Sequence, residues 1–266
     1  MKMKEGYFTY DNKKLFYRDM GAGPAVLLLH GFPFDGRIWL PFAKVLTGRL
    51  RLIIPDLPGF GKSEHPEKQL DMHLMGEALA ALAEQLNLGR CAIIGHSMGG
   101  YIALAMASQN MLANLKGMVL FHSQAASDDE AARTKRDDSI RLINNDMPRF
   151  VNGFVPGLYG KTKPESAGEH LAIALSQNPD TVASAMAGLR DRQSHVQWLT
   201  EASIPLLFIL GKEDSRMPAA NILAQAALTP HAEVLLLSNV GHMGFAEAPD
   251  IIAPVIRDFC QRCLIH

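Results

Sequence analysis

The chain has 266 residues, of which 48% are hydrophobic and 20% are charged, so it is long enough to bury a sizeable core and too hydrophobic to be disordered. A formal net charge of −1 at pH 7 gives no electrostatic reason to bind nucleic acid or an anionic membrane. Residues 1–6 lack the apolar core of a signal peptide, and no apolar run reaches membrane-spanning length, so we expect a cytoplasmic protein.

The first 121 residues alternate between predicted strands and predicted helices. Continuous apolar runs indicate strands that are covered on both faces, and apolar residues at helical spacing indicate the helices between them. The strands are expected at residues 7–10, 14–18, 24–29, 52–54, 91–96 and 117–121, and the helices at residues 37–46, 70–86 and 98–109. This alternation is typical of a mostly parallel sheet with helices on both faces.

A His-Gly-Phe-Pro sequence at residues 30–33 follows the strand at residues 24–29 directly. The glycine lets the backbone turn its next amide toward a ligand, so the Phe32 N–H is a candidate oxyanion donor. We expect His30 to anchor this loop by hydrogen bonds rather than to act as a base.

A Gly-Lys-Ser sequence at residues 61–63 looks like the end of a phosphate-binding loop. That motif needs a glycine five residues before Gly61, where this chain has Asp56, and no helix follows at once. We therefore exclude nucleotide binding and interpret residues 56–63 as a tight turn outside the ends of the strands.

Gly95-His96-Ser97-Met98-Gly99 lies between a predicted strand and a predicted helix, as a nucleophile elbow does. A serine on such a turn needs a positive φ and projects its Oγ out of the backbone. The glycines are expected because the strand and the helix pass too close for side chains at these two positions. The Met98 N–H is the second candidate oxyanion donor.

Taken together, the loop at residues 30–33, the turn at residues 56–63 and the elbow at residues 95–99 resemble the α/β-hydrolase family. The resemblance implies an eight-stranded, mostly parallel sheet and a Ser-acid-His triad in that chain order. It also implies a helical cap inserted after the sixth strand. We accordingly expect a core domain of residues 1–122 and 199–266, and a cap of residues 123–198.

The cap is predicted to contain four helices, at residues 128–144, 148–155, 164–177 and 179–191. The charged run from Asp128 to Asp138 is interpreted as a solvated helix face. Apolar residues of the cap and of the catalytic loops are expected to line the pocket, which would make charged acyl groups poor substrates. The predicted substrate-binding residues are Phe34, Phe121, Phe154, Met186, Met217 and Met243.

The sheet is expected to resume at residues 204–211, with a last strand at residues 232–237. Asp214 follows the first of these strands and matches the family's acid position, while Glu213 is expected to face solvent. His242 follows the last strand and is the predicted general base. The remaining candidates, His96, His122 and His195, have no plausible acid before them in the required order.

The three cysteines are an odd number, and one lies in a predicted core strand, which argues against a disulfide framework. Cys260 and Cys263, with His266 nearby, have the spacing of metal ligands but no second Cys/His pair elsewhere. We therefore expect neither a metal nor a cofactor.

The sequence thus predicts a serine hydrolase that cleaves a small, mainly apolar carboxylic ester through an acyl-enzyme. Its catalytic residues would be Ser97, Asp214 and His242, with the oxyanion hole at Phe32 and Met98. A lactonase, a C–C bond hydrolase or a perhydrolase with the same triad remains open, as does a ligand-binding receptor of the same fold. The partner is a small molecule, while the physiological substrate and the oligomeric state stay open.

Overall fold

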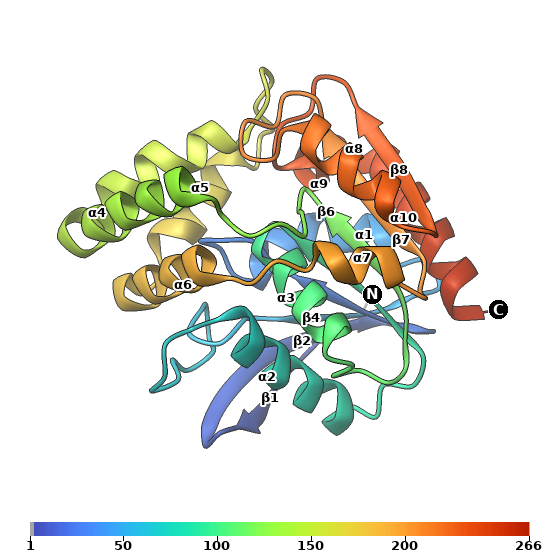
Figure 1. The fold of residues 1–266 in the computed structure, drawn as a ribbon. Coiled ribbons are helices and arrows are strands. Elements are labelled where there is room, and N and C mark those ends of the chain that lie inside the picture. The colour runs from blue at the N-terminus through green and yellow to red at the C-terminus, as the bar shows by residue number, and fades with distance from the viewer. Residues whose placement is uncertain (1–2, 266) are drawn as a thin grey trace.

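Eight strands form one sheet in the computed structural model, which describes residues 3–265 (Figure 1). The strand order is β1-β2-β4-β3-β5-β6-β7-β8; β2 is antiparallel to β1 and β4, and the remaining pairs are parallel. The predicted fold class is confirmed. The strands are β1 (Met3–Tyr10), β2 (Lys13–Gly21), β3 (Ala25–Leu29), β4 (Arg51–Pro55), β5 (Cys91–His96), β6 (Leu115–Phe121), β7 (Leu206–Gly211) and β8 (Ala232–Leu237).

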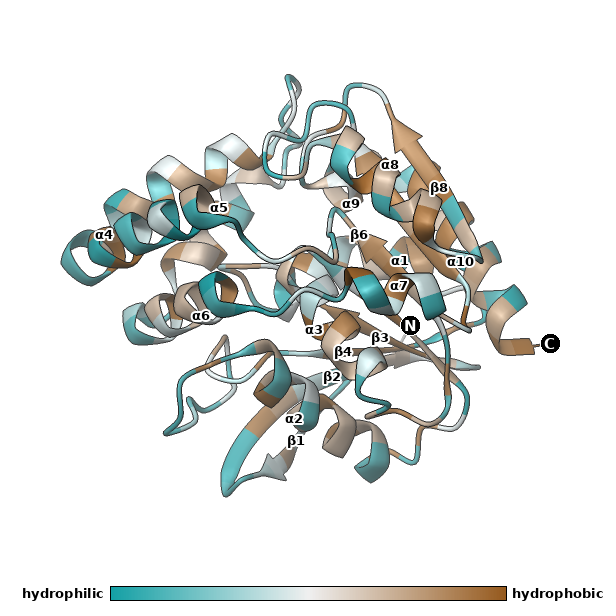
Figure 2. Ribbon diagram, viewed as in Figure 1, coloured by the Kyte–Doolittle hydropathy of each residue, from teal (hydrophilic) through white to brown (hydrophobic). Residues whose placement is uncertain are grey.

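The centre of the sheet is hydrophobic, as the apolar runs of the sequence predict. Every residue of β3, β5 and β7 is buried, whereas β8 at the edge is half-exposed. Figure 2 shows the central strands mostly in the hydrophobic colour. Strands covered on both faces need no polar residue along their length, which explains the uninterrupted runs.

Helices cover both faces of this sheet. The α-helices of the described residues are α1 (Leu40–Leu46), α2 (Met72–Gln85), α3 (Met98–Ser108), α4 (Glu130–Phe154), α5 (Ala167–Leu175), α6 (Pro179–Asp191), α7 (Val196–Glu201), α8 (Ala219–Leu228), α9 (Gly244–Glu247) and α10 (Pro249–Ile265). A side chain at Gly95 would run into α3, and one at Gly117 would run into α10. Within the described residues, no helix combines the length and the apolar character needed to cross a membrane.

Helix α4 joins two helices that the sequence analysis predicted separately. Its backbone breaks at Asp146, where φ is −158° and ψ is 76°. The Asp146 side chain accepts a hydrogen bond from the Arg149 N–H at 3.0 Å, and Pro148 lies in the first turn of the second segment. An aspartate cap followed by an early proline is a regular way to begin a helix, so the two predicted segments are both present.

Helices α4, α5 and α6 lie together outside the layers of the sheet (Figure 1). They belong to the segment that the sequence analysis assigned to a cap. Helix α7, which was not predicted, crosses the proposed boundary at residue 198. The division at residues 123 and 198 stays a prediction.

Candidate active site

Ser97 lies between β5 and α3 with φ at 51° and ψ at −111°. Its side chain makes no capping hydrogen bond to α3, so its Oγ is not held by the helix that it precedes. A Cβ at Gly95 would overlap the carbonyl oxygen of Gly99, and a Cβ at Gly99 would overlap the carbonyl oxygen of Leu29. The two glycines therefore let the elbow close tightly around the serine.

Asp214 follows β7 and is held by donors on both carboxylate oxygens. Oδ2 accepts from His242 Nδ1 at 2.8 Å, and Oδ1 accepts from the backbone N–H groups of Arg216 and Met217 at 2.9 Å each. Burial opposes ionisation, but the charge of His242 and the hydrogen bonds of His122 and His242 lower the pKa of Asp214. The acid is therefore a carboxylate that orients the His242 ring.

His122 donates a second imidazole hydrogen bond to the same carboxylate oxygen, at 3.1 Å from its Nδ1. It is fully buried at the end of β6 with φ at 48°, and burial lowers its pKa, so the ring is neutral. The sequence analysis rejected His122 as a base and did not anticipate this contact. The order of the strands was the missing information, because β6 and β7 are neighbours and bring the residues that follow them together.

The atoms that His122, Asp214 and His242 offer lie within 4.8 Å of one another, as the ligands of one metal ion would. However, His242 Nδ1 and Asp214 Oδ2 are only 2.8 Å apart. Two tetrahedral zinc ligands at about 2.0–2.1 Å from the ion would be roughly 3.3 Å apart. The spacing fits a hydrogen bond between the two groups better than shared coordination.

The loop that carries Phe32 is fixed by histidines on either side. His30 Nε2 accepts from the Leu57 N–H at 3.0 Å, which is the anchoring role expected of this residue. A Cβ at Gly31 would overlap Nδ1 of His96, so the backbone can pass here only as glycine. Neither the Phe32 N–H nor the Met98 N–H donates to another loop or turn in residues 3–265.

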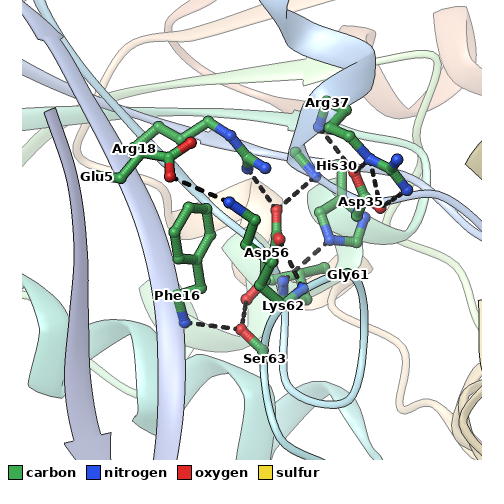
Figure 3. A network of polar contacts seen from close by, with 12 residues as sticks. Glu5, Phe16, Arg18, His30, Asp35, Arg37, Asp56, Gly61, Lys62 and Ser63 are labelled. Atoms are coloured by element: carbon green, nitrogen blue, oxygen red, sulfur yellow. Dashed lines mark hydrogen bonds and ion pairs between the residues drawn. The ribbon is translucent and has the colours of Figure 1, made fainter. Parts of the chain in front are cut away.

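Beneath this loop, the turn at residues 56–63 is organised by a buried carboxylate (Figure 3). Asp56 accepts from Arg18 Nη1 at 2.6 Å, from the Gly36 N–H at 3.0 Å and from the Lys62 N–H at 2.9 Å. The Ser63 hydroxyl donates to the Asp56 carbonyl at 2.6 Å. Both side chains of the Arg18–Asp56 pair are almost fully buried, so the residues that resemble a phosphate loop support the site structurally.

His96 is buried beside Ser97 and lies between the site and the core. Its Nε2 lies 2.9 Å from the carbonyl oxygen of His242, and its ring packs against Trp39 and Phe245. Burial, followed by the neighbouring histidines, lowers the pKa of His96 well below its usual value. These contacts give His96 a structural role.

Glu213 corrects an expectation of the sequence analysis. The side chain is only 18% exposed rather than facing solvent, and its Oε2 accepts from the Lys161 N–H at 2.7 Å. Lys161 belongs to the segment between α4 and α5, so Glu213 binds that segment to the loop after β7. Its hydrogen bonds therefore differ in kind from those of Asp214.

A cavity of about 360 Å³ brings Ser97, His242 and Phe32 together. Three of the six predicted substrate-binding residues line it, namely Phe154, Met186 and Met217. Leu189, an apolar residue of the expected cap, also contributes to the wall, as does Tyr101, which the sequence analysis did not select.

The other three predicted substrate-binding residues do not line this cavity. Phe121 is fully buried against Trp39, and Phe34 is fully buried against His170. Met243 is likewise inaccessible. Their places beside the catalytic loops suggested a pocket, but their side chains belong to the core.

The charged run is exposed over most of its length, as interpreted, but one side of it lines the cavity. Its first residue, Asp128, and the residues Ala132, Lys135, Arg136 and Ser139 line the cavity. The Asp128 side chain is only 7% exposed, between Arg136 and Arg192. Residues spaced by three, four and seven share one face of a helix, so the periodicity was a signal that could have identified this polar face.

A family model described as the alpha/beta hydrolase fold matches residues 24–249. Pimeloyl-(acyl-carrier protein) methyl ester esterase from Xanthomonas campestris is 28% identical in an alignment 249 residues long that covers 90% of this chain and 96% of that protein.

Solved structures are also similar over nearly the whole chain. A thermophilic esterase from Thermogutta terrifontis, solved with malate bound, superposes with a TM-score of 0.90 at 29% identity and covers 99% of this chain and all of that one. An esterase from Exiguobacterium antarcticum has a TM-score of 0.88 at 22% identity, over 94% of this chain and 97% of its own. The latter likeness supports the fold alone.

Proposed function

Because the chain belongs to the alpha/beta hydrolase fold family, we propose that it is a serine esterase whose triad is Ser97, Asp214 and His242. The observation that carries the proposal is the 2.8 Å hydrogen bond between Asp214 and Nδ1 of His242, which lines the same cavity as Ser97. The similarity to two esterases at 28% and 29% identity supports the same chemistry.

These hydrogen bonds support the following proton positions. Asp214 is a carboxylate and accepts the Nδ1 proton of His242, which leaves the Nε2 lone pair free for the Ser97 proton. Ser97 Oγ then attacks the ester carbonyl, and the alcohol leaves with that proton. Water, activated by the same histidine, attacks the acyl-enzyme and regenerates the serine.

The backbone N–H groups of Phe32 and Met98 are the proposed oxyanion donors. Neither is committed to another loop or turn in the part of the chain that the structure describes, and the Phe32 loop is held by His30. Donors that are fixed before the reaction stabilise the developing charge without reorganisation.

The proposed substrate is a small carboxylic ester with an apolar acyl part. Phe154, Met186 and Met217 offer an apolar wall, and a cavity of about 360 Å³ limits the size of the acyl group. Each buried methylene contributes about 0.8 kcal/mol, so kcat/KM is expected to rise with acyl length until this wall is covered.

The test is Ser97→Ala, with Ser108→Ala on the same helix as the control. Ser97→Ala is expected to abolish labelling by a fluorophosphonate and to lower ester turnover by several orders of magnitude, because the nucleophile is removed. The Ser108 hydroxyl donates only to the Ala105 carbonyl of its own helix, so that variant is expected to keep both properties.

Wild-type turnover that persists in Ser97→Ala would contradict the mechanism. A panel of esters, lactones, thioesters and peroxide, run with both variants, also compares ester hydrolysis with the other reactions that such a triad can perform. No labelling and no turnover of the panel by the wild type would favour a ligand-binding role.

A further inference from the structure

The cavity around Ser97 has an excess of positive charge. Lys135, Arg136 and Arg216 line it, while Asp128 is its one acidic side chain among the described residues. The chain as a whole has a net charge of −1, so this accumulation is local. Clefts lined by charge of one sign concentrate ligands of the opposite sign.

Asp128 does not balance these cations. It is nearly buried and already pairs with Arg136 and, at 2.7 Å, with Arg192. Arg136 Nη1 also approaches the Met186 sulfur at 3.5 Å. One carboxylate therefore neutralises at most one of its two arginine partners, and it contributes nothing to Arg216 or Lys135.

Arg216 has no acidic partner within 4.0 Å among residues 3–265, and neither has Lys135. The Arg216 guanidinium lies over the ring of Phe154, with its central carbon 4.5 Å from the ring centroid. Loss of water lowers the pKa of Arg216, which Asp214 opposes and Arg136 reinforces. The Arg216 residue remains exposed, and a cation that no carboxylate of the chain pairs with can receive one from a ligand.

The position of Arg216 relates it to the chemistry. It follows Asp214 by two residues, and its backbone N–H donates to the Asp214 carboxylate. The loop that carries the acid therefore also presents the guanidinium, while Lys135 lines the same cavity from α4. A group bound between them would lie within the same cavity as Ser97.

We propose that the substrate is an ester that carries a separate carboxylate, which binds to Arg216 and Lys135 while the ester bond lies at Ser97. The inference rests on the proposed esterase function and names its substrate class. A guanidinium edge matches the two oxygens of a carboxylate, and Phe154 beneath it holds the fork in place. The sequence expectation that charged acyl groups are poor substrates is replaced by this proposal.

The test compares anionic and neutral esters on the full chain. The first pair is mono-4-nitrophenyl glutarate and 4-nitrophenyl pentanoate, which have equal acyl length and differ by one carboxylate. The second pair, 4-acetoxybenzoate and phenyl acetate, places the carboxylate on the alcohol side. 4-Acetoxyphenyl phosphate tests whether a phosphate is accepted equally well.

The variants are Arg216→Gln and Lys135→Gln, with Arg149→Gln as the control for the loss of one positive charge from an exposed position of the cap. In at least one carboxylate pair, the ratio of anionic to neutral kcat/KM is expected to exceed one in the wild type. Arg216→Gln is expected to lower that ratio about 10- to 100-fold, as befits the loss of a charge-assisted hydrogen bond, and Lys135→Gln to lower it less. Arg149→Gln is expected to leave the ratio unchanged.

Each outcome has a distinct meaning. Suppose that neutral esters are turned over and that Arg216→Gln changes the ratio of anionic to neutral kcat/KM no more than Arg149→Gln does. That result would overturn this inference and keep the esterase proposal. Absence of turnover for every ester would overturn both. A ratio that falls in Arg216→Gln only for the phosphate would replace the carboxylate by a phosphate as the recognised group.

Discussion

Four hydrogen-bond donors surround the Asp214 carboxylate and fix its orientation. Two backbone N–H groups fix Oδ1, so the direction of the carboxylate does not depend on His242 alone. His122 and His242 then share Oδ2 at 3.1 and 2.8 Å. Because His122 is buried and neutral, it can donate from Nδ1 without adding a competing charge.

We predict that His122 positions Asp214. His122→Leu removes one donor to a buried carboxylate and is expected to lower kcat about tenfold or more, with a smaller change in KM, because a hydrogen bond to a charged group contributes about 1.5–3 kcal/mol. His122→Asn is expected to recover much of kcat, since asparagine tolerates a positive φ and retains a donor near Nδ1. Steady-state kinetics of both variants, with unfolding curves, check this. Equal losses in the two variants would instead indicate a packing role.

Among the elements, β5, α3 and β3 pack very closely at the elbow. This closeness depends on Gly95 and Gly99, whose added side chains would meet backbone oxygens that have no room to move. A second element-scale link joins the cap to the loops: Gln177 donates to Asp35 at 2.8 Å and accepts from the Gly61 N–H at 2.9 Å. Burial opposes the ionisation of Asp35, but hydrogen bonds from Arg37 and Gln177 lower the pKa of Asp35. The carboxylate in this link therefore stays ionised.

We predict that alanine substitutions at a glycine of the elbow and at a glycine of α4 have opposite effects on stability. Gly99→Ala is expected to destabilise the protein by about 3 kcal/mol or more, because the new methyl group overlaps the Leu29 carbonyl. Gly153→Ala, in α4 with nothing within 4 Å of the added carbon, is expected to stabilise it by about 0.5–1 kcal/mol. Chemical denaturation of both variants measures the difference. A small loss in Gly99→Ala would show that β3 and α3 can separate without cost.

For the whole molecule, the buried histidines determine how stability responds to acid. Burial lowers the pKa of His30, His96, His122 and His170, so the folded state keeps these rings neutral where the unfolded chain protonates them. Below the unfolded pKa of about 6.5, the unfolded state therefore binds more protons than the folded state. The free energy of unfolding consequently decreases as the pH is lowered. Asp214, whose pKa is lowered, is ionised in both states in this window and adds no slope until pH approaches about 4.

We accordingly predict a loss of stability between pH 6.5 and pH 5.5, of up to about 1 kcal/mol for each of the four rings. The measurement is the urea midpoint at pH 7.5, 6.5 and 5.5 at constant ionic strength. A midpoint that stays constant down to pH 5.5 would mean that the folded protein accommodates these protons, contrary to the burial of the rings.

Local interactions determined much of this protein, and the sequence predicted those parts. The apolar runs of β3, β5 and β7 predict buried strands because no polar residue interrupts them. The turn at Ser97 was predictable because its glycines and its serine lie within five residues. The family resemblance supplied the chain order of Ser97, Asp214 and His242, which periodicity alone does not contain.

Only the tertiary structure decided which groups meet across the sheet and under the cap. His122 and Asp214 are 92 positions apart and touch because β6 and β7 are neighbours. Periodicity can mark the face of α4 that contains Lys135 and Arg136, but not whether that face meets water or the cavity. Phe34, Phe121 and Met243 show the converse, since large apolar side chains near a catalytic loop fit a pocket or a core equally well. Burial depends on what the rest of the chain places opposite a residue, and that is a property of packing.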